Sequence, residues 1–391
     1  MSQKFIPLSV PNFKGKELEY VTHAIETEWV STGGPYVNEF EEKVCNYVNA
    51  KGAVSVQNGT SGLHIALKVC GVTREDEVIV PTLTFIAAVN PVKYLGAEPI
   101  FMDCDDSLCV DPYKLMEFCR MECTFINGKL INKRTGKHVK AIIVVHVFGN
   151  MSSMDKIMKI AEEFNLKVVE DATEALGTYY TNGIYKGKYA GTIGTVGVYS
   201  FNGNKIITTG GGGMIVSNEE ELLKRAKHLT TQAKSDELYY IHDEIGYNYR
   251  MTNLQAAIGI AQLEQLEDFI KIKEVNYKLY KKFINEIPGL EILNFNENIR
   301  SNYWFYALFI KDDFPLKRDQ VIKYLSSNNV QVRPIWDLIS EQQPYIANQN
   351  YKIEKSKTYL AHIINIPCSS NLSTEDVLYV IDCLRNVHNK K

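Results

Sequence analysis

The pattern of hydrophobic and polar positions divides the chain into two parts. Over the first two-thirds, short apolar runs alternate with segments whose apolar residues recur at helical spacing. Strands are expected at residues 53–56, 78–81, 99–102, 141–145 and 166–169, and helices at residues 38–48, 59–70, 85–94 and 154–164. Strands separated by helices of this length predict right-handed βαβ units, and hence an α/β fold with a mainly parallel sheet.

After residue 252 the pattern changes. One long helix is expected over residues 254–270, and after it come a strand at 303–310, a helix at 317–325, a strand at 330–333 and a helix at 375–387. This mixture predicts a smaller α+β domain, so we expect a large domain over residues 1–260 and a small one over residues 261–391. A polar stretch at residues 124–138 contains Asn127-Gly128, which predicts a hairpin insertion.

Composition narrows the class of protein. Of the 391 residues, 45% are hydrophobic and 23% charged, which is typical of a globular protein. The formal net charge is −3 and no basic cluster occurs, which argues against nucleic-acid binding. No apolar run is long enough to span a membrane, and residues 1–7 lack the apolar stretch of a signal peptide. We therefore expect a cytoplasmic protein whose eight cysteines are reduced thiols.

Polar residues follow several of the expected strands. Open α/β sheets bind ligands beyond the carboxyl ends of their strands, and Asp171, His146 and residues 82–85 occupy such positions. The carboxylate of Asp171 is suited to pair with a cationic ring nitrogen, or alternatively to cap a following helix.

Two further segments carry possible ligand contacts. Residues 58–62 (Asn-Gly-Thr-Ser-Gly) begin a helix, where unpaired N–H groups attract phosphate, although Thr60 or Ser61 could simply cap the first turn. Lys205 precedes four glycines at residues 210–213 and is either a surface lysine or a buried nucleophilic amine. The loop at residues 246–253 contains polar side chains between aromatic ones, with Thr252 as the expected N-cap of the long helix.

Other ligand-binding motifs fail. The dinucleotide fingerprint G-x-G-x-x-G does not follow any expected strand, and no Walker A loop is complete. Cys104, Cys109, Cys119 and Cys123 do not have the paired spacing of a zinc site, so we expect no metal. His64 lies on a helix face and is expected to pack in the core.

Taken together and in this order, residues 171–177, 200–205 and 246–253 resemble the sugar aminotransferases of the DegT/DnrJ/StrS family. The resemblance covers nearly the whole chain. It implies a fold-type I transferase that uses pyridoxal 5′-phosphate (PLP), with a large domain built on a seven-stranded type of sheet and a smaller C-terminal α+β domain.

The resemblance also implies roles for individual residues. Lys205 binds PLP covalently and acts as general base, and Asp171 pairs with the pyridine nitrogen. Phe85 stacks on the ring, and Glu174 lies near the ring hydroxyl, where other members carry Gln or His. The expected phosphate contacts are Gly59, Thr60, Ser61 and Ser200 of one subunit and Asn248 of its partner, so a homodimer with shared active sites is expected.

Residues 27–34 and 80–87 are most similar to the 4-aminotransferases of bacillosamine and legionaminic acid pathways. That similarity implies ping-pong transfer of the amino group of L-glutamate to C-4 of a 4-keto-6-deoxy-N-acetylhexosamine nucleotide sugar, with UDP favoured, for a surface polysaccharide. Trp29, Thr32, Arg250 and Arg333 are the expected substrate contacts. Arg333-Pro334 is not followed by the histidine-containing segment common in the family.

Three alternatives share this fold. A 3-keto sugar aminotransferase would use the same cofactor chemistry. A pyridoxamine-dependent dehydratase is disfavoured, because such relatives replace the lysine by histidine. A catalytically silent PLP-fold binding or regulatory protein is disfavoured by the presence of both Lys205 and Asp171.

Overall fold

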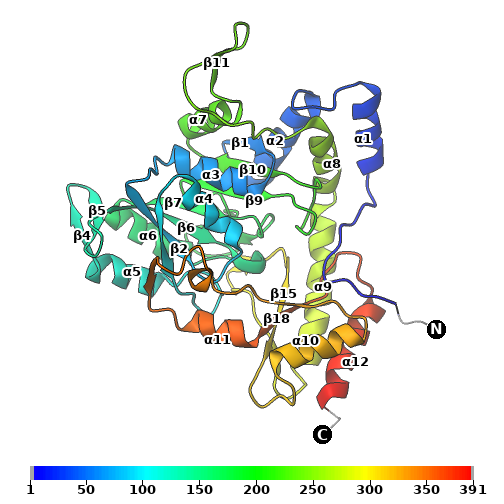
Figure 1. The fold of residues 1–391 in the computed structure, drawn as a ribbon. Coiled ribbons are helices and arrows are strands. Elements are labelled where there is room, and N and C mark those ends of the chain that lie inside the picture. The colour runs from blue at the N-terminus through cyan, green and yellow to red at the C-terminus, as the bar shows by residue number, and fades with distance from the viewer. Residues whose placement is uncertain (1–3, 389–391) are drawn as a thin grey trace.

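The computed structural model describes residues 4–388, and its centre is one sheet of ten strands (Figure 1). The strands lie in the order β1-β10-β9-β7-β6-β2-β3-β17, and β4 and β5 are attached beside β6. Their bounds are β1 Gly52–Val56, β2 Asp76–Pro81, β3 Glu98–Met102, β4 Cys123–Ile126, β5 Lys129–Asn132, β6 His138–Val145, β7 Lys167–Asp171, β9 Val196–Ser200, β10 Gly213–Ser217 and β17 Gln349–Tyr351.

The middle of this sheet is parallel. β9, β7, β6, β2, β3 and β17 pair in parallel, whereas β10 pairs antiparallel with β9 and β1. The predicted α/β fold is thus confirmed. Because parallel strands end at one edge, Val145, Asp171 and Ser200, the last residues of β6, β7 and β9, lie along the same edge of the sheet.

The α-helices are α1 Glu17–Glu26, α2 Pro35–Val48, α3 Gly59–Val69, α4 Asn90–Tyr94, α5 Pro112–Met121, α6 Met154–Phe164, α7 Glu220–Thr230, α8 Asn253–Leu263, α9 Leu266–Ile284, α10 Arg318–Ser327, α11 Lys355–His362 and α12 Thr374–His388. Both α1 and α2 pack against α8. The α2–α8 contact is close because Gly259 has no side chain; a Cβ there would lie 2.6 Å from the Phe40 ring.

A second, antiparallel sheet is formed by the C-terminal third of the chain. It contains four strands in the order β13-β15-β18-β16, with bounds β13 Leu290–Ile292, β15 Tyr306–Ile310, β16 Arg333–Pro334 and β18 Ile363–Ile366. The contacts of this part with the first part are extensive: β17 completes the large sheet, and Ile6 pairs with Val330. The domain boundary at residue 260 stays a prediction.

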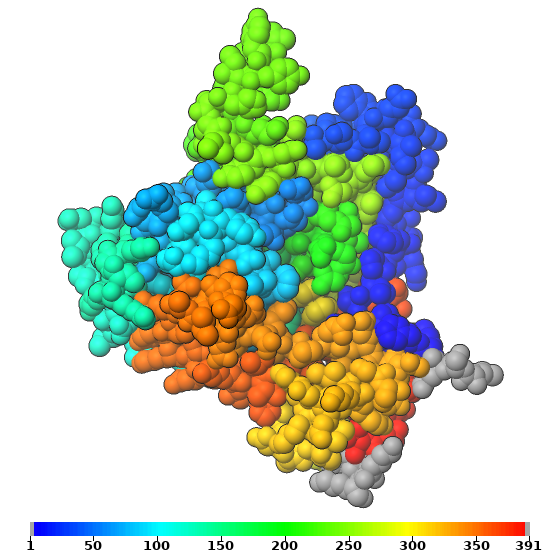
Figure 2. All heavy atoms as spheres, viewed as in Figure 1, coloured from blue at the N-terminus to red at the C-terminus, as the bar shows by residue number. Residues whose placement is uncertain are grey.

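Two hairpins differ in their surroundings. β4 and β5 form the predicted hairpin, with Asn127 and Gly128 both at positive φ as a tight turn requires, and β5 continues the large sheet. A second hairpin, β11 (Lys234–Asp236) and β12 (Ile241–His242), projects beyond α7 away from the body (Figures 1 and 2). A short pair, β8 (Tyr179–Tyr180) and β14 (Ile299–Arg300), completes the strands.

Three expected elements are wrong in detail. The helix expected over residues 85–94 is split into a 3₁₀ turn, η1 (Ile86–Ala88), and α4, because Pro91 has no N–H to continue a helix from residue 85. The long helix breaks after Leu263. There the side-chain amide of Gln265 donates to the Ala261 carbonyl, in place of a main-chain N–H of a continuing helix. The strand expected at 330–333 is reduced to Arg333–Pro334, because Val330 pairs with Ile6 instead.

Several smaller expectations hold. His64 is buried beside Tyr94, Tyr247 and Tyr249, and burial lowers its pKa to about 4. Thr252 caps α8 in a capping box with Gln255. All eight cysteines are free thiols. Within residues 4–388, no helix is both long and apolar enough to cross a bilayer.

Candidate active site

A cleft of about 380 Å³ lies at the edge where the parallel strands end. It brings together residues from both parts of the chain, and seven of the predicted cofactor contacts line it: Gly59, Thr60, Phe85, Asp171, Glu174, Ser200 and Lys205. The remaining wall is formed by Asn58, Leu63, Thr84, Ala87, Ala88, Thr173, Asn202, Asn204, Trp304, Phe305 and Trp336.

Lys205 follows β9 and lies among acidic and aromatic groups. Its side chain is 13% exposed, its Nζ lies 3.9 Å from Oε1 of Glu174, and the same amine is 4.3 Å from the centre of the Trp304 ring. Burial lowers the pKa of the amine from its ordinary value, although the Glu174 and Asp171 carboxylates oppose that shift. The alternative of a surface lysine is therefore wrong.

Asp171 is the last residue of β7 and is buried at the base of the cleft. Its Oδ1 accepts the N–H of Thr173 at 3.1 Å, and no helix follows, so the expectation that it caps a helix is wrong. Burial raises the pKa of this carboxyl, and the Thr173 contacts and Lys205 partly offset that effect.

The base of the cleft rests on a buried, hydrogen-bonded pair, Glu170 and His146. Glu170 accepts hydrogen bonds from His146 Nε2 at 2.8 Å and from the N–H groups of Gly191 and Ile193. Burial alone would raise the pKa of Glu170, but these donors outweigh it and lower the pKa. Ser152 N–H donates to Nδ1 of His146, which fixes the hydrogen on Nε2. The main-chain N–H of His146 binds the Asp171 carbonyl, so the pair braces the end of β7.

The start of α3 forms another wall. Asn58 is the N-cap, and its side chain accepts the Ser61 N–H at 2.8 Å, so neither Thr60 nor Ser61 caps this helix as the alternative proposed. A Cβ at Gly59 would lie 3.0 Å from Ser200 Cβ and 3.0 Å from Thr173 Cγ2. The helix N-terminus therefore approaches the Ser200 hydroxyl closely and offers its N–H groups to an anion.

Six predicted site residues lie outside this cleft. Ser61 is buried inside the first turn of α3. Asn248 is exposed in the loop before α8, Trp29 is 56% exposed, and Arg333 is exposed on β16. Ser61, Asn248, Trp29 and Arg333 therefore do not line the cleft of their own chain.

The other two, Thr32 and Arg250, meet at a separate cavity of about 200 Å³ beside the N-terminus of α2. Lys227 also lines this cavity, but it is ion-paired with Glu41 at 2.8 Å. The Nε of Arg250 is buried without a hydrogen-bond partner among the described residues, and the guanidinium has no ion pair there. An unpaired guanidinium next to a helix N-terminus favours an oxyanion.

Sequence analysis missed the aromatic wall. Trp304, Phe305 and Trp336 lie about a hundred residues or more after Lys205 in sequence, and no local motif marks them. Trp304 donates its indole N–H to the Asn204 carbonyl at 2.7 Å and so holds the loop before Lys205. The one available signal was that two of only three tryptophans fall in the part predicted to form the small domain.

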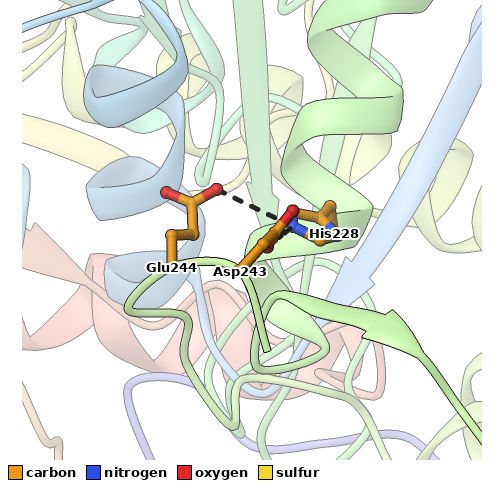
Figure 3. A group of neighbouring side chains, drawn as sticks. All are labelled: His228, Asp243 and Glu244. Carbon is orange, nitrogen blue, oxygen red and sulfur yellow. Dashed lines mark hydrogen bonds and ion pairs between the residues drawn. The ribbon is translucent and has the colours of Figure 1, made fainter. Parts of the chain in front are cut away.

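One group of possible metal ligands occurs among the described residues: His228, Asp243 and Glu244, at the base of the projecting hairpin (Figure 3). His228 Nε2 lies 2.8 Å from Asp243, and Glu244 is ion-paired with the Arg225 guanidinium. That guanidinium already supplies the positive charge, so the group ties the hairpin to α7. The absence of a metal stays a prediction.

An amine buried beside two carboxylates at the strand ends of a parallel sheet suits a PLP-dependent aminotransferase of fold-type I. The profile of the DegT/DnrJ/EryC1/StrS aminotransferase family matches residues 11–385, and the chain belongs to this family. It is a PLP-dependent sugar aminotransferase.

Individual relatives agree with this family. The chain is 38% identical over 389 residues to a GDP-perosamine synthase of Escherichia coli O157:H7, covering 99% of this chain and 100% of that protein. It is 29% identical to a UDP-4-amino-4,6-dideoxy-N-acetyl-beta-L-altrosamine transaminase of Campylobacter jejuni, covering 98% of each. Its fold matches the crystal structure of DesI in the presence of its TDP-sugar product, with a TM-score of 0.87 and 25% identity, covering 100% of this chain and 94% of the other.

The residues of the cleft fit PLP. Lys205 offers an amine with a lowered pKa, which suits attachment to an aldehyde. The buried carboxylate of Asp171 suits a protonated ring nitrogen, and the N-terminus of α3 beside Ser200 suits a phosphate. When bound, PLP supplies the electron sink for proton removal next to the amino group.

Proposed function

We propose that this enzyme transfers the amino group of L-glutamate to C-4 of a 4-keto-6-deoxy nucleotide sugar by a ping-pong reaction. The observation that carries the proposal is the Lys205 amine, held 3.9 Å from Glu174 in a cleft that also contains Asp171. A buried amine beside two carboxylates is suited to add or remove a proton at a carbon next to nitrogen.

Each residue of the cleft has a proposed part. Lys205 would hold the cofactor through its amine, and the free amine would act as general base and acid at the carbon next to the donor nitrogen. Asp171 balances the ring charge. Gly59, Thr60 and Ser200 bind the phosphate, while Phe85 covers the ring. Trp304, Phe305 and Trp336 exclude water from the amine, which strengthens its interactions with the carboxylates. Glu174 lies near the ring hydroxyl.

The sequence-based hypothesis favoured a UDP-linked N-acetylhexosamine, and the comparisons with relatives bear on the choice of nucleotide. The 38% identity to a protein named GDP-perosamine synthase supports a GDP-linked 4-keto sugar as the first candidate. The 29% identity to a UDP-4-amino-4,6-dideoxy-N-acetyl-beta-L-altrosamine transaminase supports the UDP-linked substrate as the second.

The cavity at Arg250 supports an anionic substrate. Its guanidinium and the N-terminus of α2 are suited to a diphosphate, with Thr32 as a neighbouring hydroxyl. We further propose that Trp29 and Arg333 contact substrate at the outer rim, although neither lines the cleft of its own chain.

We also propose a homodimer. In it, Ser61 contacts the cofactor phosphate of its own subunit, and Asn248 reaches the phosphate of the partner subunit. The exposure of Asn248 supports a contact outside its own chain. A cytoplasmic location and a role in surface polysaccharide synthesis complete the proposal.

A substrate panel tests these assignments. The enzyme is incubated with PLP, L-glutamate and either GDP-4-keto-6-deoxymannose, UDP-4-keto-6-deoxy-N-acetylglucosamine or a 3-keto nucleotide sugar, and products are identified by NMR. We expect amination at C-4, with kcat/KM for the GDP-linked sugar at least about tenfold above that for the UDP-linked sugar. Amination of the 3-keto sugar alone would contradict the position. A protein that acquires no visible absorption with PLP would be a silent member of the fold.

A further inference from the structure

A second carboxylate faces Lys205, and the proposed mechanism gives it no part in proton transfer. Glu174 is 4% exposed, and its Oε1 lies 3.9 Å from Lys205 Nζ. Its other oxygen, Oε2, accepts the N–H of Phe148 at 2.8 Å, which fixes the direction of the carboxyl group. The side chain is therefore held in place while one oxygen stays available to the amine.

Few other charges surround this pair. Asp171 ends β7 shortly before Glu174, Phe148 offers only a main-chain N–H, and Asn302 donates to the main-chain carbonyl of Glu174 at 2.9 Å rather than to its carboxyl group. The Trp304 ring covers the amine. One amine thus meets two buried carboxylates, and burying an unbalanced negative charge is costly.

Asp171 and Glu174 differ in their available partners. Asp171 Oδ1 is bound by Thr173 N–H at the end of β7, in the place that suits a ring nitrogen. Glu174 exerts the larger charge effect on Lys205. Burial raises the pKa of Glu174 to about 7, whereas burial lowers the pKa of Lys205, so burial brings the pKa values of the two groups toward each other.

We propose that Glu174 and Lys205 share one proton during the reaction. Glu174 accepts the proton of the Lys205 ammonium when the amine has to act as nucleophile or base, and returns it when the amine has to act as acid. In this step an N–H bond of Lys205 breaks and an O–H bond of Glu174 forms. The total charge of the pair stays zero and nothing is oxidised.

The proton moves only a short distance between Glu174 and Lys205. The 3.9 Å separation exceeds a hydrogen bond, so the amine swings about the end of its flexible chain, or one water bridges the two groups. The inference rests on Lys205 as the reactive amine. Glu174 acts only through that amine, by setting whether the amine carries a proton, and is therefore a positioning residue.

The first test uses the cofactor-free protein, so it does not depend on substrate. Lys205 is labelled with trace acetic anhydride at a series of pH values, and the labelled peptide is quantified by mass spectrometry. Glu174→Gln keeps an oxygen for the Phe148 N–H but removes the negative charge that stabilises the ammonium. We expect the labelling midpoint to fall by about one pH unit in Glu174→Gln, and to stay near wild type in Glu174→Asp and in the exposed control Glu341→Gln.

The second test uses the loaded enzyme and its pH profile. In wild type, protonation of Glu174 on acidification blocks proton uptake from Lys205, giving kcat an acid limb near the pKa of about 7. We expect Glu174→Gln to lose this limb and to lower kcat about tenfold at pH 8, with KM within about twofold of wild type. Glu174→Asp should retain the limb.

A labelling midpoint that is unchanged or higher in Glu174→Gln would overturn the inference, as would an unaltered acid limb. Neither result would affect the proposed sugar substrate, because labelling requires no turnover. Conversely, a protein that aminates none of the tested sugars but shows the shifted midpoint would contradict the substrate and retain the proton-sharing pair.

Discussion

The cleft around Lys205 and the segment of residues 228–250 differ in how far their side chains are held by contacts within the chain. In the cleft, Lys205 faces Glu174, Asp171 is bound by Thr173, and the supporting Glu170 is saturated by donors. In the segment, ion pairs tie down only the base of the hairpin (Figure 3). Its apolar side chains Leu238, Tyr239, Tyr240 and Ile245 are each at least 73% exposed.

This difference separates two tasks. Groups that move protons are held by contacts within one chain, because their separation and burial set their pKa values. The Nε of Arg250 has no hydrogen-bond partner among residues 4–388, and the apolar side chains of the hairpin tip are exposed, as expected of surfaces completed by a ligand or a second subunit. Four changes, from the largest expected effect to the smallest, test whether the two regions are independent.

Replacing Lys205 by Ala should have the largest effect. The variant loses both the attachment point and the proton-transferring amine, so we expect 2-oxoglutarate formation to fall at least about a thousandfold. Lys205→Arg is the matched control, because it keeps the positive charge but should be equally inactive. Near wild-type turnover in the Ala variant would place the reaction elsewhere in the molecule.

Asp171→Asn should be the next most damaging. An amide retains an acceptor for the Thr173 N–H but cannot balance a ring charge, so we expect kcat to fall about a hundredfold. KM for the sugar should hardly change, which steady-state kinetics would reveal. A variant in which KM alone rises would instead assign Asp171 to substrate binding.

Arg250→Ala should act on binding rather than chemistry. Loss of the unpaired guanidinium should raise KM for the nucleotide sugar roughly thirtyfold, with kcat within about threefold. Arg250→Lys keeps the charge without the planar fork and should give an intermediate KM. If kcat fell and KM did not, Arg250 would belong to the reacting part of the site.

The double change Leu238→Ser and Tyr240→Ser should have the smallest effect. If the tip packs on a second copy of the chain, polar side chains there should weaken self-association about tenfold, as analytical ultracentrifugation would measure. Visible absorption with PLP should persist, because the tip contributes nothing to the cleft of its own chain. Unchanged self-association would contradict the tip as an interface.

The sequence placed some residues correctly through local rules alone. Asp171 follows an apolar strand and the glycine at position 59 begins a helix, so their meeting at one sheet edge follows from parallel pairing, whereas Ser200 is expected at the site only from the family resemblance. Local rules failed at Pro91 and at Gln265, where one residue interrupts an otherwise helical pattern. They also failed for Trp304 and Trp336, which reach the cleft only through the packing of the C-terminal third.

What the sequence by itself determined is the alternation of strands and helices in the first two-thirds of the chain, which follows from local patterns, and the family and cofactor, which follow from the resemblance of residues 171–177, 200–205 and 246–253. The tertiary structure decided that Glu174 faces Lys205, that Trp304 covers the amine, and that Arg250 meets Thr32 away from the cleft. These contacts join segments that are far apart in the chain. They also set burial, and burial rather than residue type decides where the proton between Glu174 and Lys205 resides.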